Sequence, residues 1–267
     1  MENPGRAQRQ SRMTGDTKIG GRSGQFPATR WSAILAARSK DPAEKSRALE
    51  VIVSAYWKPI YKYMRLRWGK PNEDAKDLTQ EFFARLIEKD YLGDFNPAKA
   101  RLRTFLRVCA DRFLANGFKA AKRLKRGGGA QHISLDFAAA EAELFRANMP
   151  LPADASPQAM DDFLEKEFIR SLFGLAVETL REFCARRGKQ VHFQLFEAYD
   201  LAVEESERSG YEGLARKFGI ATTDVTNYLA FARREFRRIA LEKLREMTAS
   251  DAEFRREARA LLGVEPE

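Results

Sequence analysis

Apolar residues recur at three- and four-residue steps along most of the chain from residue 29 onward, which is the period of amphipathic helices. The pattern predicts two helices within residues 29–66, with Pro59 expected to bend the second. A third helix is expected over 73–89, where Asn72 offers an N-cap, and a fourth over 98–125. No stretch alternates between apolar and polar residues in the manner of a strand, so we expect helices throughout.

The domain organisation follows from where this period is interrupted. Glycines at 127–129 and prolines near 150 indicate a flexible linker, with room for a short helix around 138–147. The first residues are rich in glycine, Arg and Lys and poor in large apolar side chains, which is typical of a disordered tail. The prediction is an all-α fold with two helical domains joined by a flexible linker. The expected segments are a basic tail at 1–25, a first domain at 26–126, the linker at 127–160, a second domain at 161–248 and a C-terminal tail at 249–267.

Composition narrows the classes of function. The chain has 47 Lys and Arg against 38 Asp and Glu, a formal net charge of +9, which favours polyanionic partners. Its two cysteines and two histidines lie far apart in sequence and are too few for a zinc cluster. No stretch reaches the roughly 20 apolar residues of a membrane-spanning helix, and no secretory signal is visible. We therefore expect a cytoplasmic protein with no membrane partner.

The clearest motif is a pair of short helical patterns that meet at Gly219, within residues 211–244. A glycine there permits the tight turn of a helix-turn-helix, and Thr222 or Thr223 is placed to cap the second helix. That second helix would expose polar and basic groups able to reach base edges and phosphates in the major groove. These groups are Thr226, Asn227, Tyr228, Arg233, Arg234, Arg237 and Arg238. The alternative is an ordinary helical hairpin with a solvated basic face.

The expected fourth helix is one-sided in charge. Asp111 is its only carboxylate, so its cations are expected to repel one another unless a polyanion lies nearby. These cations are Arg101, Arg103, Arg107, Arg112, Lys119, Lys122, Arg123, Lys125 and Arg126. Phe105, Phe113 and Phe118 lie between them. Exposed rings beside arginines can stack on unpaired bases, although most of these three are expected in the core.

The expected third helix has an acidic face. Asp74, Asp77 and Glu81 follow one another at steps of three and four residues, so they form one stripe. Three carboxylates could hold a divalent metal, as in a nuclease. Carboxylate sites in helical proteins usually draw ligands from several helices and add histidine, and no histidine is near. A solvated or partner-binding acidic face is therefore favoured over a metal site.

Taken in order, these three pieces resemble the sigma-70 family of bacterial RNA polymerase sigma factors, in its extracytoplasmic-function (ECF) branch. Residues 74–83 are similar to the family segment that docks on the clamp of the polymerase β′ subunit. Residues 95–126 are similar to the segment that melts and reads the promoter minus-ten element, and residues 211–244 to the segment that reads the minus-thirty-five element. The resemblance covers most of residues 26–245, and the order of the motifs is more specific than any one of them.

The resemblance implies a role for individual residues. Core polymerase would be bound by Asp74, Asp77, Leu78, Gln80, Glu81 and Phe82. Minus-ten DNA would be bound by Arg101, Arg103, Arg107, Arg112, Asn116, Lys119, Lys122 and Arg123. Minus-thirty-five DNA would be bound by Thr222, Thr223, Thr226, Asn227, Tyr228, Arg233, Arg234 and Arg237. The implied partners are core RNA polymerase through its β′ clamp and β subunits, promoter DNA, and an anti-sigma factor as a further candidate.

The sequence departs from the family pattern in three places. Arg112 stands near the position where the family often has a polar residue. Tyr228 and Phe231 dilute the usual arginine-rich pattern of the recognition helix, and the segment 180–209 is longer than is typical of the family. No catalytic residue, metal or cofactor is implied. Two other classes stay open. A stand-alone helix-turn-helix regulator would bind duplex DNA tightly by itself, and a metal-dependent nuclease would cleave DNA with magnesium and lose this activity in Asp74→Asn.

Overall fold

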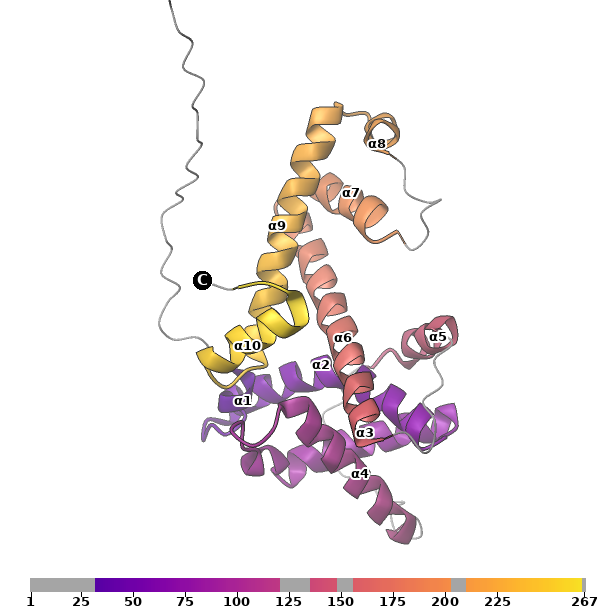
Figure 1. Ribbon diagram of the computed structural model, residues 1–267, viewed down its shortest axis with the longest axis vertical. Helices are drawn as coiled ribbons and strands as arrows, with labels where there is room; N and C mark the ends of the chain where they lie inside the picture. Colours follow the sequence, from indigo (N-terminus) through magenta and orange to yellow (C-terminus); the bar gives the residue numbers. More distant parts are fainter. Residues whose placement is uncertain (1–31, 121–134, 148–155, 203–209, 266–267) are drawn as a thin grey trace, which may run out of the picture. The chain divides into compact units, whose positions relative to one another are not determined.

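All regular elements in the described residues are helices, as the apolar period predicted. The computed structural model describes residues 32–120, 135–147, 156–202 and 210–265 (Figure 1). Its elements are α1 (Ala33–Ala36), α2 (Pro42–Arg67), α3 (Asn72–Glu88), the 3-10 helix η1 (Tyr91–Asp94), α4 (Leu102–Ala120), α5 (Phe137–Ala147), α6 (Pro157–Arg186), α7 (Gln190–Asp200), α8 (Tyr211–Phe218), α9 (Thr222–Glu246) and α10 (Asp251–Leu262).

Several helices begin where the sequence supplies a capping side chain. Asp41, Ser156 and Ser250 precede α2, α6 and α10, and each accepts a hydrogen bond from a backbone N–H of the first turn. Such bonds satisfy donors that have no partner inside the helix. Before α10 a second bond resembles a capping box, because the Glu253 carboxylate accepts a hydrogen bond at 2.8 Å from the N–H of Ala249, the residue before the cap.

Three boundaries differ from the prediction. Asn72 is the first residue of α3 and not its cap, and its side chain instead accepts a hydrogen bond from the Tyr61 hydroxyl at 2.7 Å, which ties α2 to α3. Thr222 is likewise the first residue of α9; the cap is Ala221, and it makes no side-chain hydrogen bond. The helix expected from residue 98 begins at Leu102, after a turn in which Asn96 binds the Ala98 N–H.

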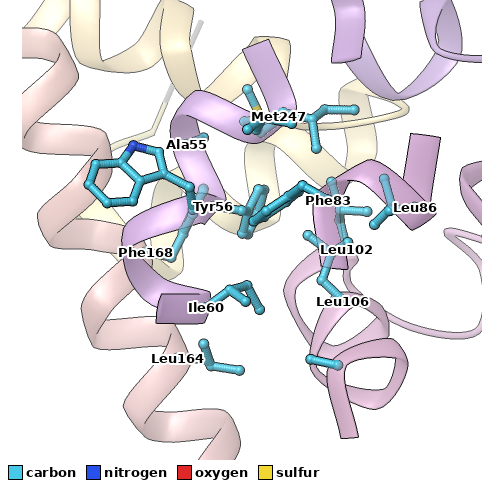
Figure 2. Close-up of a cluster of buried hydrophobic side chains, with 14 of the residues drawn as sticks. Ala55, Tyr56, Ile60, Phe83, Leu86, Leu102, Leu106, Leu164, Phe168 and Met247 are labelled. Atoms are coloured by element: carbon cyan, nitrogen blue, oxygen red, sulfur yellow. The ribbon is translucent and has the colours of Figure 1, made fainter. Parts of the chain in front are cut away.

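The first hydrophobic cluster surrounds α2. Helices α1, α3, α4, α5 and α6 pack against it, and its largest fully buried side chains include Tyr61, Phe82 and Phe168. The ring of Phe168 on α6 stacks on Tyr56 with centroids 4.9 Å apart. Figure 2 shows Tyr56 and Phe168 within this cluster, and Met247 reaches the same cluster from the end of α9.

The second hydrophobic cluster lies between the C-terminal half of α6 and helices α7, α8 and α9. Leu180 of α6 and Val225 and Leu229 of α9 are fully buried in it. Helices α6 and α9 run side by side in Figure 1, and they make the most extensive helix contact in the described residues. Because α6 is one continuous helix of 30 residues, it contributes to both clusters.

Residues 249–267, expected as a tail, contain α10. Phe254 and Ala258 of this helix are buried in the first cluster, and nearby the Ser32 hydroxyl donates a hydrogen bond to the Thr248 carbonyl at 2.7 Å. Of the expected linker, residues 135–147 form mainly α5, and α6 begins at Pro157; the rest lies outside the described residues, as does the expected N-terminal tail. None of the described helices is long and apolar enough to cross a membrane.

Candidate nucleic-acid interface

The turn between α8 and α9 has the geometry that the sequence predicted. Gly219 ends α8 in the left-handed conformation at φ 65°, which a residue with a Cβ adopts only at a cost. The Ile220 N–H then donates to the Ala215 carbonyl at 3.1 Å, which closes the turn. Leu214 and Val225 are buried on either side of it, so α8 and α9 are held by the second cluster.

The outer face of α9 is polar at its beginning and basic further on. Thr222, Thr223, Thr226 and Asn227 are exposed in its first two turns. Arg237, further along the same helix, is also exposed and makes no ion pair with any described residue. Arg234 is also exposed, and among the described residues its ion-pair partner is the neighbouring Glu235, at 3.5 Å. These six side chains form a continuous accessible face.

Two predicted contact residues have partners inside the chain. Arg233 donates to both carboxylate oxygens of Asp200 at the end of α7, and these hydrogen bonds raise its pKa. The ring of Tyr228 stacks on His192 with centroids 3.9 Å apart and planes 14° apart. Both residues therefore brace α7 against α9, and Tyr228 is half-buried.

His192 was not singled out by sequence reasoning. Its Nδ1 is buried without a hydrogen-bond partner among the described residues, and burial, together with Lys189, lowers its pKa. The basic residues Arg216 and Lys217, exposed at the end of α8, were also missed. Their position beside the predicted turn was the signal, because the first helix of a helix-turn-helix runs along the DNA backbone.

The arginines at the start of α4 are engaged inside the chain. Arg103 donates to Glu165 of α6 at 2.6 Å and to Glu257 of α10 at 2.7 Å. Arg101 binds the same two carboxylates, at 2.8 and 3.0 Å. The side chains of Arg103 and Glu257 are only 8% and 3% exposed, so this group, called here the α4 ion-pair network, is largely out of water.

Arg107 extends the same pattern. Its guanidinium binds Asp161 of α6 at 2.7 Å and Asp111 of its own helix at 3.2 Å. The expectation that these three arginines meet no carboxylate other than Asp111 is therefore corrected, since α6 and α10 supply the missing charges. Arg112 and Asn116 are exposed, and Arg112 makes no ion pair with a described residue. The Lys119 side chain, Lys122 and Arg123 lie outside the described residues.

The acidic face of α3 is accessible in part. Asp74, Asp77 and Gln80 are exposed and Leu78 is half-buried, while Glu81 forms an ion pair with Arg85 at 2.6 Å. Phe82 has no exposed surface; it packs against Phe83 and Phe113, and is a core residue rather than part of a docking face. Nowhere in the described ranges do three His, Cys, Asp or Glu side chains converge as metal ligands would.

Comparisons with known proteins add no relative to this picture. No protein-family model matches the chain, and no curated protein or solved structure matches it either.

Proposed function

We propose that this chain is a sigma-type specificity factor that binds core RNA polymerase, recognises promoter minus-ten and minus-thirty-five elements, and promotes DNA melting. The observation that carries the proposal is the α8–Gly219–α9 turn with its accessible polar and basic face. In this proposal α1 to α4 act as the polymerase-binding and minus-ten module, and the second cluster with α7 to α9 as the minus-thirty-five module.

In this proposal, residues at the beginning of α9 contact the base edges. Threonine hydroxyls and the Asn227 amide present donors and acceptors that match base edges, whereas guanidinium groups such as Arg237 suit phosphates. Tyr228, stacked on His192, contributes by fixing the orientation of α9 and not by touching a base. Arg233 acts on DNA only if it leaves Asp200.

In this proposal, the exposed face of α3 binds core polymerase. Asp74 and Asp77 are exposed on one helix face with Gln80 beside them, and this negative patch suits a basic partner surface. On α4 the minus-ten contact rests on Arg112 and Asn116, because the α4 ion-pair network occupies the other described arginines.

The base-reading assignment is tested with the variants Asn227→Ala and Arg237→Ala. We expect Asn227→Ala to reduce the discrimination between bases at one base pair by about 1–3 kcal/mol. Arg237→Ala should weaken the binding of DNA of every sequence alike and reduce the salt dependence of binding. Anisotropy titrations against a duplex library over a range of salt concentrations measure both. Gln194→Ala, on the exposed side of α7, is the matched control. A change of preference in Arg237→Ala with an intact salt slope contradicts the assignment.

The polymerase assignment is tested by charge reversal. Asp77→Lys with Glu81→Lys should abolish binding to core polymerase and run-off transcription, because the docking face changes sign. Glu50→Lys with Asp162→Lys changes the net charge equally at exposed sites on α2 and α6 and should leave both intact. Core binding at wild-type strength in the α3 double variant contradicts the sigma-type proposal.

A stand-alone helix-turn-helix regulator is the second candidate. The α4 ion-pair network favours it, since three arginines expected to hold melted DNA have partners within the chain. This candidate predicts tight duplex binding without polymerase and no transcript from core polymerase plus this chain. The run-off assay therefore separates the two proposals.

A further inference from the structure

A group of aromatic and basic side chains lies where the end of α6 and the start of α7 meet α9. Phe183 of α6 and Phe231 of α9 are half-buried, with ring centroids 6.5 Å apart and planes 20° apart. Four cations lie over these rings, two from each side of the helix contact. The basic-aromatic patch consists of Phe183, Arg187, Lys189, Phe231, Arg234 and Arg238.

The cations are held close to the rings. Arg187 lies 4.5 Å from the Phe183 centroid and Lys189 4.5 Å from the Phe231 centroid. Arg234 lies 5.4 Å from the Phe231 centroid and Arg238 5.5 Å from the Phe183 centroid. A cation over an aromatic face is attracted to it and loses rotamer freedom before any ligand arrives. The cost of ordering these long side chains on binding is therefore reduced.

The patch keeps a positive charge. The carboxylates that form ion pairs with the patch are those of Glu235 and Glu242, and both bind Arg238, at 2.9 and 2.6 Å. Glu235 also lies 3.5 Å from Arg234. Arg187 and Lys189 make no ion pair with any described residue, in contrast to Arg181 and Arg186 earlier on α6, which both bind carboxylates. Two of the four cations are thus left for an outside anion.

The patch adjoins the reading face of α9. Arg234 belongs to both, and it follows the exposed Asn227 by seven residues, which is about two turns of helix. Lys189 lies against His192, with Nζ 3.5 Å from Nε2, and His192 stacks on Tyr228 next to Asn227. A helix in the major groove has a phosphate backbone along each flank, so cations beside such a helix lie within reach of phosphates.

We propose that the basic-aromatic patch binds the sugar–phosphate backbone of duplex DNA on one flank of the groove that α9 enters. The inference rests on the proposed DNA-binding function and extends the contact surface from α8 and α9 to the α6–α7 turn. Arg187 and Lys189 each neutralise a phosphate, and the two phenyl rings hold them in position. The patch adds affinity for every sequence equally, since it reaches no base edge.

The test uses the full chain with Arg187→Ala and Lys189→Ala combined. Its affinity for a duplex of mixed sequence, and for the same duplex with one base pair changed, is measured by anisotropy over a range of salt concentrations. We expect weaker binding to both duplexes by the same factor. The slope of log affinity against log salt should fall by about 1.8, because each phosphate contact contributes about 0.9.

The matched control is Arg181→Ala combined with Arg186→Ala. It removes the same amount of charge from α6, the helix that leads into the α6–α7 turn. Both of these side chains already have carboxylate partners, so the salt slope should not change. Phe231→Leu keeps the charge and removes one ring. It should weaken duplex binding while the salt slope, and so the number of phosphates contacted, stays the same. This result would show that the ring positions the cations, because the net charge of the variant is unchanged.

Each outcome decides between the possibilities. If the patch variant keeps the wild-type salt slope while Arg237→Ala weakens binding, the patch proposal is overturned and the proposed function stands. The same holds if the patch variant loses binding to core polymerase and keeps its affinity for DNA, because the surface then serves a protein. If the wild-type chain binds neither duplex DNA nor a polymerase–promoter complex, both proposals fail together.

Discussion

Two helices of this chain carry rows of arginines, and the folded structure uses the two rows differently. At the start of α4, Arg103 is 8% exposed and lies between Glu165 and Glu257. On α9, Arg237 is exposed and meets no carboxylate among the described residues. A basic helix in a sequence therefore does not reveal whether its charge is available to an outside polyanion.

The difference comes from what packs against each helix. The acidic residues of α6 and α10 face α4 because both helices bury apolar side chains in the first cluster. Around α9, Asp200 and Glu235 form ion pairs with arginines on the flanks of the helix, and its outer face is exposed in the part of the chain that the structure describes. We therefore assign the first row to stability and the second to binding, an assignment that mutations can test.

The largest expected effect is the loss of stability in Arg103→Ala. Removing this guanidinium leaves Glu257, 3% exposed, without its main counter-charge, and breaking one side of a buried ion pair costs about 3–5 kcal/mol. Chemical denaturation followed by circular dichroism measures the free energy of unfolding. Arg112→Ala, on the exposed side of the same helix, should change it by less than about 0.5 kcal/mol. Equal stability in the two variants contradicts the contrast between the rows.

The next effect concerns the turn that presents the second row. Gly219→Ala should lower the free energy of unfolding by about 1–2 kcal/mol, since a left-handed backbone is unfavourable for alanine and no neighbouring atom crowds the site. Gly174→Ala, within α6 and equally uncrowded, should raise it by about 0.5–1 kcal/mol. Thermal unfolding of both variants compares them. A shift of stability in the same direction for both substitutions would mean that Gly219 is not required for its left-handed backbone.

Much of the fold was predictable from local pattern. The apolar period gave the all-α class, which is confirmed, and Gly219 marked a turn that the structure contains. These features depend on residues a few positions apart, for which helix geometry is known in advance. The helix α10 was missed although its signals were present, because Ser250 and Glu253 form a capping pair and Phe254 and Ala258 lie on one face.

The pairing of charges was not predictable in the same way. Arg103 and Glu257 are 154 residues apart, and only the packing of α10 brings them together. The same holds for the basic-aromatic patch, since Lys189 and Phe231 meet through the contact of α7 with α9. No local rule states which distant carboxylate will neutralise an arginine. The sequence alone therefore predicted DNA binding for the arginines of both α4 and α9.

A smaller effect should follow when an arginine of the second row is released from its partner. Asp200→Ala removes the carboxylate that holds Arg233, which lies one turn before Arg237. The freed guanidinium should gain one phosphate, which steepens the salt slope of duplex binding by about 0.9. Stability should fall by less than about 1 kcal/mol, because the pair is partly exposed. An unchanged slope means that Arg233 does not face the DNA.

The smallest expected effect is a pH dependence of stability from His192 of α7, whose ring packs against Tyr228 and Phe231 of α9. Because burial lowers its pKa in the folded chain, the unfolded chain binds the proton first as the pH falls. Its contribution to stability is therefore complete above about pH 6.5 and declines below that value. In His192→Phe, which keeps a ring against Tyr228, this part of the decline should disappear. Denaturation at pH 7.5 and pH 5.5 measures it, and His132 cancels because both proteins contain it; an identical decline in the two proteins contradicts the role assigned to His192.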